Sequence, residues 1–133
     1  MIRPVIRPVA LIMLMSAPAM AQEVDCANPI TQLDMTMCEY QAWERADADL
    51  NDMYGAAMAA VRQSDADYPI EGLSEEDRLR TAQRAWVAFR DANCDVAGYP
   101  MRGGSAEPML INACLRSMTE ARTNELMLLT MEF

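Results

Sequence analysis

The sequence contains no histidine and no lysine. Without histidine, every mechanism that uses an imidazole as general base is excluded, including the common serine and cysteine hydrolase triads. Because lysine is also absent, all eleven basic side chains are arginines, which stay charged and can bind a carboxylate through two parallel hydrogen bonds. The composition therefore favours binding and structural roles for the charged residues over histidine chemistry.

Long apolar runs are also missing, since no stretch approaches the roughly 20 apolar residues that a membrane-spanning helix needs. A short apolar run at residues 9–15 follows two arginines and precedes small residues at Ala19 and Ala21, which is the pattern of a secretory signal peptide. We predict a signal peptide over residues 1–21 and one small domain over residues 22–133. This domain should be periplasmic or secreted, with no membrane insertion after cleavage.

The predicted mature domain is poor in positive charge. It keeps nine arginines and all twenty acidic residues, for a formal charge of −11. Nucleic acid is therefore a poor partner, whereas a basic protein or peptide is a better one. The alternative explanation of the acidity is solubility alone.

The four cysteines lack the close pairs that zinc sites and redox motifs use. Cys26, Cys38, Cys94 and Cys114 are separated by 11, 55 and 19 residues. In a short exported chain this spacing predicts two disulfides better than a zinc site. The acids within residues 65–77 lack the spacing of an EF-hand loop, so we expect no calcium site, and no other metal or cofactor.

No segment shows the period-two alternation of a β-strand. Residues 31–63, 74–97 and 108–131 instead have helical periodicity, and Thr31 and Ser74 are each followed three residues later by an acid, as helix N-caps often are. The loops between these segments are rich in Pro, Gly, Asp and Ser and short enough for antiparallel neighbours. We predict an all-α fold, a small antiparallel three-helix bundle with two disulfides.

Helical-wheel positions predict which side chains each segment buries. In the first segment the side chains predicted to be buried are Trp43, Ala46, Leu50, Met53, Tyr54, Ala57, Met58 and Val61. In the second they are Leu79, Ala82, Trp86, Phe89 and Ala97, and in the third Ile111, Cys114, Leu115, Met118, Ala121, Leu126 and Leu129. Each stripe also contains an ionisable residue: Asp47 in the first, Arg90 in the second, and Arg122 and Glu125 in the third.

These four ionisable groups sum to zero charge. An isolated buried charge is prohibitively costly, so such groups must pair with one another or reach solvent. Antiparallel register brings Arg90 within a turn of Asp47, which makes this the first pair to expect. We predict a charge-balanced structural network inside or along the edge of the bundle.

The same wheels predict the disulfide pairing. Cys94 and Cys114 face inward on either side of the second loop, whereas Cys38 points toward the side where the arm carrying Cys26 can fold. The favoured pairs are therefore Cys26–Cys38 and Cys94–Cys114. All four cysteines fall at one end of the bundle, so the crossed pairings stay open.

Three segments, "ADADLNDMY", "AQRAWVAFRDANC" and "CLRSMTEARTNEL", resemble in that order the motifs of the LprI-type lysozyme inhibitor domain family, long listed as a domain of unknown function. The matched positions are Cys26, Cys38, Asp47, Leu50, Asn51, Tyr54, Gln83, Trp86, Arg90, Cys94, Cys114, Arg122 and Leu126. The resemblance implies an exported, helical, disulfide-bonded module that inhibits lysozyme. Among the matched positions, Asn51, Tyr54, Gln83 and Trp86 complete the predicted structural network.

Three classes of function are compatible with these residues. An inhibitor would cover the cleft of a basic lysozyme, with Arg102 in the second loop as a candidate contact to its catalytic carboxylates, although a solvated connector explains Arg102 as well. An enzyme would use a carboxylate pair such as Asp47 and Glu125, but an ion-pair network explains the same residues with fewer assumptions. The third class is a non-catalytic envelope adaptor or chaperone-like protein-binding domain. We predict a binding module and no enzyme.

Overall fold

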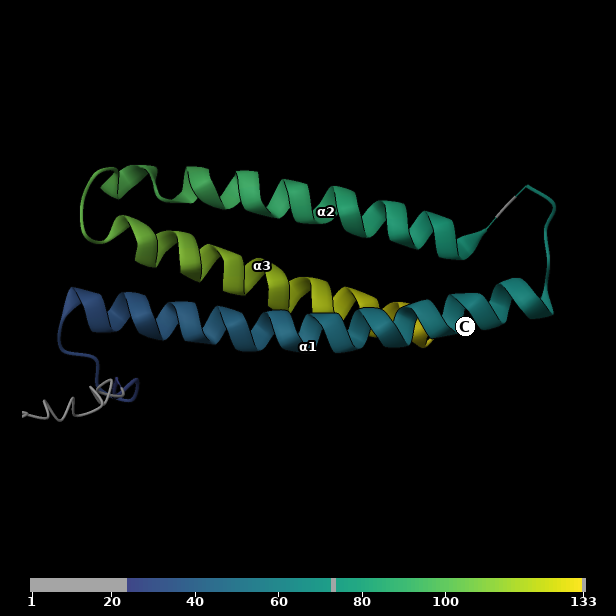
Figure 1. Ribbon diagram of the computed structural model, residues 1–133, viewed down its shortest axis with the longest axis horizontal. Helices are drawn as coiled ribbons and strands as arrows, with labels where there is room; N and C mark the ends of the chain where they lie inside the picture. The colour runs from purple at the N-terminus through teal and green to yellow at the C-terminus, as the bar shows by residue number, and fades with distance from the viewer. Residues whose placement is uncertain (1–23, 73, 133) are drawn as a thin grey trace, which may run out of the picture.

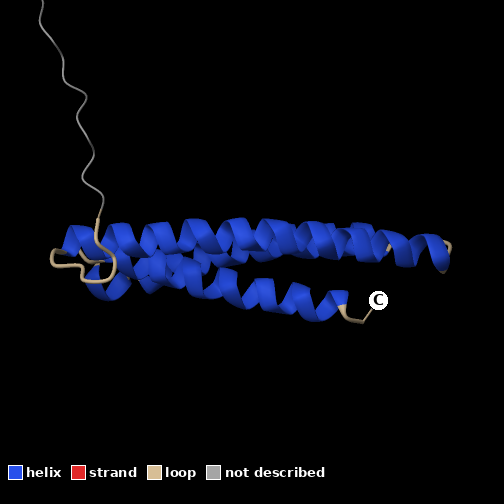
Figure 2. Ribbon diagram, turned by 90° about the horizontal axis from the view of Figure 1, so that it is seen from below, coloured by secondary structure: helices blue, strands red, loops and turns tan. Residues whose placement is uncertain are grey.

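Three α-helices run antiparallel in the computed structural model, which describes residues 24–72 and 74–132. They are α1 (Gln32–Asp67), α2 (Glu75–Ala97) and α3 (Glu107–Thr130), with a 3₁₀ turn η1 (Tyr99–Met101) between the last two. Figure 1 shows them lying along one another in an elongated bundle, and Figure 2 shows only helices and loops in the described part of the chain. The predicted all-α three-helix fold is confirmed, while the predicted signal peptide lies outside the described residues.

Two of the predicted helix starts are capped as expected. Thr31 and Asp34 form a reciprocal capping box, with each side chain accepting a hydrogen bond from the other residue's backbone N–H. The bond from the Thr31 backbone lowers the pKa of Asp34. At α2, the Ser74 hydroxyl accepts from the backbone N–H of Asp77 at 3.1 Å.

The predicted boundaries differ from the observed ones by a few residues. The first helix continues four residues beyond the expected end at Gln63, because Asp65 near its C-terminus binds the next helix. The second loop contains η1, and the third helix begins at Glu107, one residue before Pro108. The proline still occupies the first turn, where its missing N–H costs nothing.

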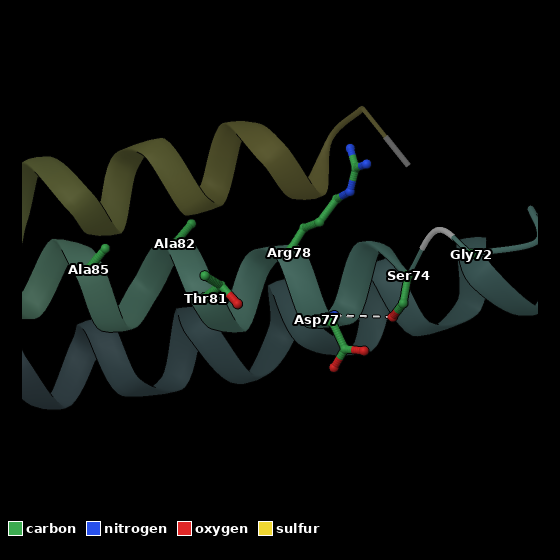
Figure 3. Close-up of a pocket in the computed structure, with 7 residues that line it drawn as sticks. All are labelled: Gly72, Ser74, Asp77, Arg78, Thr81, Ala82 and Ala85. Atoms are coloured by element: carbon green, nitrogen blue, oxygen red, sulfur yellow. Dashed lines mark hydrogen bonds between the residues drawn. The ribbon is translucent and has the colours of Figure 1, made fainter.

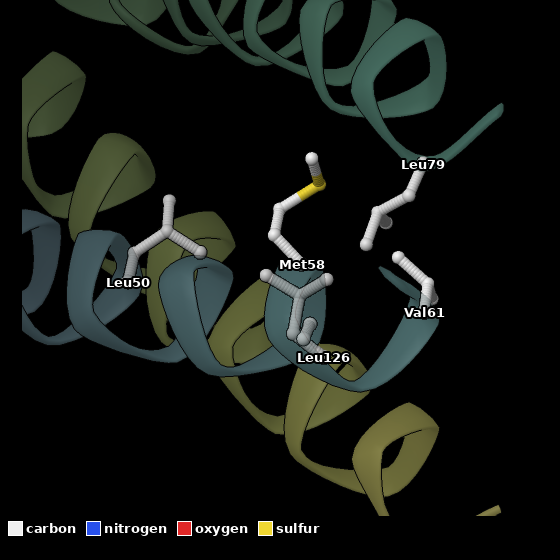
Figure 4. Packing of buried hydrophobic residues seen from close by; sticks show 6 residues of the cluster. Leu50, Met58, Val61, Leu79 and Leu126 are labelled. Carbon is white, nitrogen blue, oxygen red and sulfur yellow. The ribbon is translucent and has the colours of Figure 1, made fainter. Parts of the chain in front are cut away.

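The apolar core lies mainly between α1 and α3, which pack against each other along most of their lengths. Its buried cluster consists of Leu50, Ala57, Met58, Val61, Leu79 and Leu126. Figure 4 shows Leu79 reaching from α2 toward Met58 and Val61 of α1. All six belong to the predicted stripes, so the buried faces of α1 and α3 were largely predicted.

The buried face of α2 is narrower than predicted. Only Leu79, Arg90 and Cys94 are buried on this helix, and all three lie on one line along it. Phe89, which we expected in the core, is 60 % exposed, since one residue of helix turns it about 100° away from Arg90. Ala82 on α2 and Ala121 on α3, also predicted to be buried, are exposed as well.

Both disulfides hold the same end of the bundle. Cys26 bonds to Cys38, joining the N-terminal arm to α1, and Cys94 bonds to Cys114, joining the end of α2 to the start of α3. The favoured pairing is therefore confirmed over the crossed alternatives. Close packing at this end also explains Gly98, because a Cβ there would lie 2.9 Å from Cγ1 of Ile111 on α3.

Candidate functional site

The predicted polar residues meet around Arg90, whose side chain enters the bundle from α2. Arg90 is only 6 % exposed. Its Nη1 donates to Oδ1 of Asp47 on α1 at 3.1 Å and to the hydroxyl of Thr119 on α3 at 3.2 Å. Its Nε donates to Oδ1 of Asp91 at 2.9 Å. One guanidinium thus binds side chains from all three helices.

Two tryptophans lie against the Arg90 guanidinium. Its central carbon is 5.1 Å from the ring centre of Trp86 and 5.9 Å from that of Trp43. A cation over an aromatic face is attracted by the ring quadrupole, and the attraction grows when water is excluded. The rings therefore stabilise the charge that burial would otherwise penalise.

Arg122 and its partners form a second, more exposed polar group, which borders the same Trp86 ring. Its Nε donates to Oε1 of Gln83 at 3.0 Å, and its Nη1 donates to Oε2 of Glu125 at 2.8 Å. Its guanidinium also lies 5.9 Å from the ring centre of Trp86. Glu125 is thus a partner within α3, and Gln83 makes the link across to α2.

The remaining two residues of the predicted network lie on α1. Asn51 donates to Oδ2 of Asp47 at 3.3 Å, one turn along the helix. Tyr54 is half-buried against the apolar core. Together with Gln83 it lines a hollow of about 470 Å³ between α1 and α2. The structure therefore brings Asp47, Asn51 and Arg90 together directly, and Arg122, Gln83 and Glu125 in a neighbouring group.

Two residues that bind Arg90 were not predicted from the sequence. Thr119 is fully buried on the same face of α3 as Leu115 and Leu126, so its wheel position was a usable signal. Asp91 gave no such signal, because an exposed acid next to an arginine in sequence normally points away from it on a helix.

The arrangement explains the carboxylates without catalysis. Asp47 and Glu125, considered above as a catalytic pair, each bind a guanidinium in this structure. Nowhere in residues 24–72 and 74–132 do three or more Cys, Asp or Glu side chains gather into a group suited to a metal ion. The described helices also include none that is both long and apolar enough to cross a membrane.

Arg102, the predicted partner contact, lies in the exposed loop after η1. Its guanidinium stacks over the ring of Tyr99 at 5.3 Å, and no salt bridge involves it within the described part of the chain. The loop places it at the disulfide-bonded end of the bundle. Arg102 is therefore separate from the Arg90 network, by which we mean Arg90, Arg122 and the side chains that bind them.

Ion pairs also join the helices away from Arg90. Glu76 on α2 binds Arg62 of α1 and Arg80 of its own helix, and the Arg62 hydrogen bond is the main cause of the lowered pKa of Glu76. At the other end, Nε of Arg116 on α3 donates to Glu39 of α1 at 2.9 Å, which raises the pKa of Arg116. These pairs are partly solvated, so each adds little to stability.

A hollow of about 780 Å³ runs along the first turns of α2. It is lined by Gly72, Ser74, Asp77, Arg78, Thr81, Ala82 and Ala85, and Figure 3 shows Asp77 bound to the Ser74 cap there. Asp77 also pairs with Arg80, so its charge is already balanced. An open hollow along one helix, with its acid engaged in this way, offers no convergent set of polar groups for a small ligand.

Comparison with known proteins places the chain in a family. The family model described as "Lysozyme inhibitor LprI" matches residues 25–126, which include both disulfides and the whole Arg90 network. An uncharacterized protein of Rhizobium meliloti (strain 1021) is 40 % identical over 122 residues, covering 88 % of each chain. No solved structure matches this sequence. With a match over most of its length, the chain belongs to the LprI lysozyme inhibitor family.

Proposed function

We propose that this chain is a non-catalytic, exported binding protein that inhibits a lysozyme and so protects the cell wall. The family match over residues 25–126 is the observation that carries the proposal. The two disulfides support a location outside the cytoplasm, in the periplasm or beyond the cell, because such bonds persist in oxidising compartments. Lysozymes of the c-type are strongly basic, so the acidic chain has the charge to attract one.

The structural role proposed for the Arg90 network is consistent with inhibition by a surface. Its two guanidiniums, Arg90 and Arg122, are engaged between the helices by Asp47, Thr119 and Gln83. A partner protein would therefore touch the outward faces and loops. Arg102 is the proposed loop contact, because its exposed guanidinium could reach the two carboxylates of a glycosidase cleft.

The test is an inhibition titration. Purified mature protein is added to a c-type lysozyme acting on cell-wall suspensions, at low and at moderate salt. We expect saturable inhibition near one-to-one stoichiometry, weakened by salt. Arg102→Ala should weaken inhibition without changing the melting temperature. Lytic rates that stay unchanged at any inhibitor concentration would overturn the proposal.

A second candidate is a non-catalytic envelope adaptor or chaperone-like domain. Exposed apolar side chains at the disulfide-bonded end favour it, namely Phe89, Val96, Tyr99 and Met101. Such a domain would suppress aggregation of an unfolded client protein. A light-scattering assay with a reduced, aggregating client separates the two, since an inhibitor specific for lysozyme should leave that aggregation unchanged.

A further inference from the structure

The charge of the bundle is concentrated on one helix. Among the residues of α1, eight are acidic and two are arginines, for a formal charge of −6, whereas α2 and α3 each carry −1. Within the described residues, Glu44, Asp49 and Asp52 of α1 take part in no salt bridge. A positively charged partner would therefore be attracted most strongly to α1.

An apolar strip occupies the N-terminal half of the same helix. Leu33, Met37 and Tyr40 are all exposed, and their spacing of four and three residues puts them on one face. This face lies roughly a third of a turn around α1 from the buried line through Ala46 and Leu50, and its side chains stay exposed beside α3. Large apolar side chains aligned in this way are typical of protein-binding surfaces.

The apolar strip continues directly into a hollow of about 340 Å³. Its lining residues are Tyr40, Trp43, Glu44, Asp47, Ala48 and Asn51. The Tyr40 and Trp43 rings meet edge to face, with centroids 5.8 Å apart. Donation from the Tyr40 hydroxyl toward the Glu44 carboxylate raises the pKa of Tyr40. Two aromatic rings and two carboxylates thus border one hollow.

The hollow keeps a negative charge despite the nearby guanidinium. Arg90 binds both Asp47 and Asp91, and Glu44 adds a third carboxylate. These four groups sum to −2. Aromatic faces next to carboxylates suit an arginine or lysine side chain, which gains a cation–π contact and a charge-assisted hydrogen bond together.

We propose that this face of α1 is the docking surface for a basic protein, with the apolar strip Leu33, Met37 and Tyr40 packing on the partner and the hollow receiving one of its cationic side chains. The assignment rests on the proposed function and names the surface through which a lysozyme would bind. Because residues of both the strip and the hollow lie in the first half of α1, the surface is at the same end of the bundle as Arg102.

The first experiment measures affinity for a c-type lysozyme by titration calorimetry. Glu44→Gln and Asp52→Asn remove the same charge from the same helix, but only Glu44 lines the hollow. We expect Glu44→Gln to raise the Kd about tenfold and Asp52→Asn less than about threefold, because only the former loses a direct contact. Tyr40→Ala should raise the Kd more than the matched exposed variant Tyr68→Ala. If both variants of each pair raise the Kd equally while the wild type still binds lysozyme, the proposed docking surface is wrong and the proposed inhibition still holds.

The second experiment tests the hollow without lysozyme. Ethylguanidinium chloride is titrated into ¹⁵N-labelled protein, and the two tryptophan indole N–H signals are followed by NMR. We expect a saturable shift at Trp43 that Glu44→Gln abolishes, while Trp86 serves as the internal control. If the shift appears but lysozyme does not bind, the proposed function falls and the cation-binding hollow stands. Absence of the shift overturns the hollow. A concentration-dependent dimer abolished by Tyr40→Ala would instead assign the strip to a second copy.

Discussion

α2 and α3 are attached to α1 by different means. Fully buried side chains on both partners, Ala57 of α1 and Leu126 of α3 among them, form a continuous apolar contact between α1 and α3. The buried residues of α2 are only three and lie at separate points, with Leu79 near its start, Arg90 past its middle and the disulfide-bonded Cys94 near its end, while its other links to α1 and α3 are partly solvated. Apolar packing thus stabilises one pair of helices, while ion pairs and a covalent bond supply much of what fixes the third.

The difference has a physical origin in sequence composition. α2 carries nine charged residues and several alanines, so its apolar line is too thin to exclude water along its whole length. A buried ion pair and a disulfide each fix α2 at one residue, so they hold the helix where it has no continuous apolar contact. α2 should therefore be the first helix to detach when any one of these three buried attachments is lost.

The largest expected effect is in the apolar contact between α1 and α3. Leu126→Ala should lower the free energy of unfolding by about 3–4 kcal/mol, because it leaves a cavity in the best-packed part of the core. Leu79→Ala, the matched change on α2, should cost about 2 kcal/mol, since its site can collapse or fill with water. Urea denaturation of both variants measures this. Equal costs would show that α2 is packed as firmly as α3.

Removal of the Cys94–Cys114 disulfide comes next. Replacing both cysteines by alanine should cost about 3 kcal/mol from the lost loop constraint. The loss should appear in the attachment of α2, so hydrogen exchange in α2 should accelerate more than in α1 or α3. The corresponding change at Cys26 and Cys38 is the control, because it frees only the N-terminal arm and should leave exchange in α2 unchanged.

Arg90→Met tests the polar attachment. The buried Thr119 hydroxyl loses a donor and Asp47 loses its cation, so we expect a cost of about 2–3 kcal/mol. Arg122→Met is the matched control and should cost about 1 kcal/mol, since its partner Glu125 is mostly solvated. An Arg90→Met variant with an unchanged melting temperature would show that the network contributes nothing to stability.

Sequence patterns predicted the fold more fully than the details of α2. Helical periodicity found all three helices, and wheel positions gave the disulfide pairs, because both depend on local geometry. The exposure of Phe89 was not predictable in this way, because a wheel shows which face is apolar but not how closely the neighbouring helices approach it. That approach depends on the bundle as a whole.

The polar residues show the same limit. The pairing of Asp47 with Arg90 follows from register, since antiparallel packing brings the two residues within a turn of each other. The wheel position of Thr119 indicates only that it faces the core, and its bond to Arg90, like that of Asp91, depends on the rotamer that Arg90 adopts through tertiary packing. The hollow beside Tyr40 likewise requires the side-chain positions of both aromatic rings. Sequence therefore predicted which helices meet and left the surfaces they create to be found in the structure.

The smallest expected effect concerns the turn that joins α1 to α2. The Asp65 carboxylate of α1 accepts hydrogen bonds from the backbone N–H groups of Glu75 and Glu76, at 2.9 and 3.1 Å, and so caps α2 from the neighbouring helix. These bonds lower the pKa of Asp65, the Glu75 bond most. The stability that Asp65 adds is therefore present above its unfolded pKa and is lost as pH falls through its lower folded pKa.

Asp65→Asn tests this cap by removing the charge while keeping an acceptor. We expect the variant to melt slightly below the wild type at pH 7, with the difference shrinking as pH falls from about 4 toward 2, where the wild-type carboxylate is protonated too. Asp67→Asn removes the same charge from a residue that accepts from Gln63 of its own helix and, among the described residues, makes no bond to α2, so its melting curve should follow the wild type across this range. A gap between Asp65→Asn and wild type that is constant with pH would mean that the charge of Asp65 does not help to attach α2.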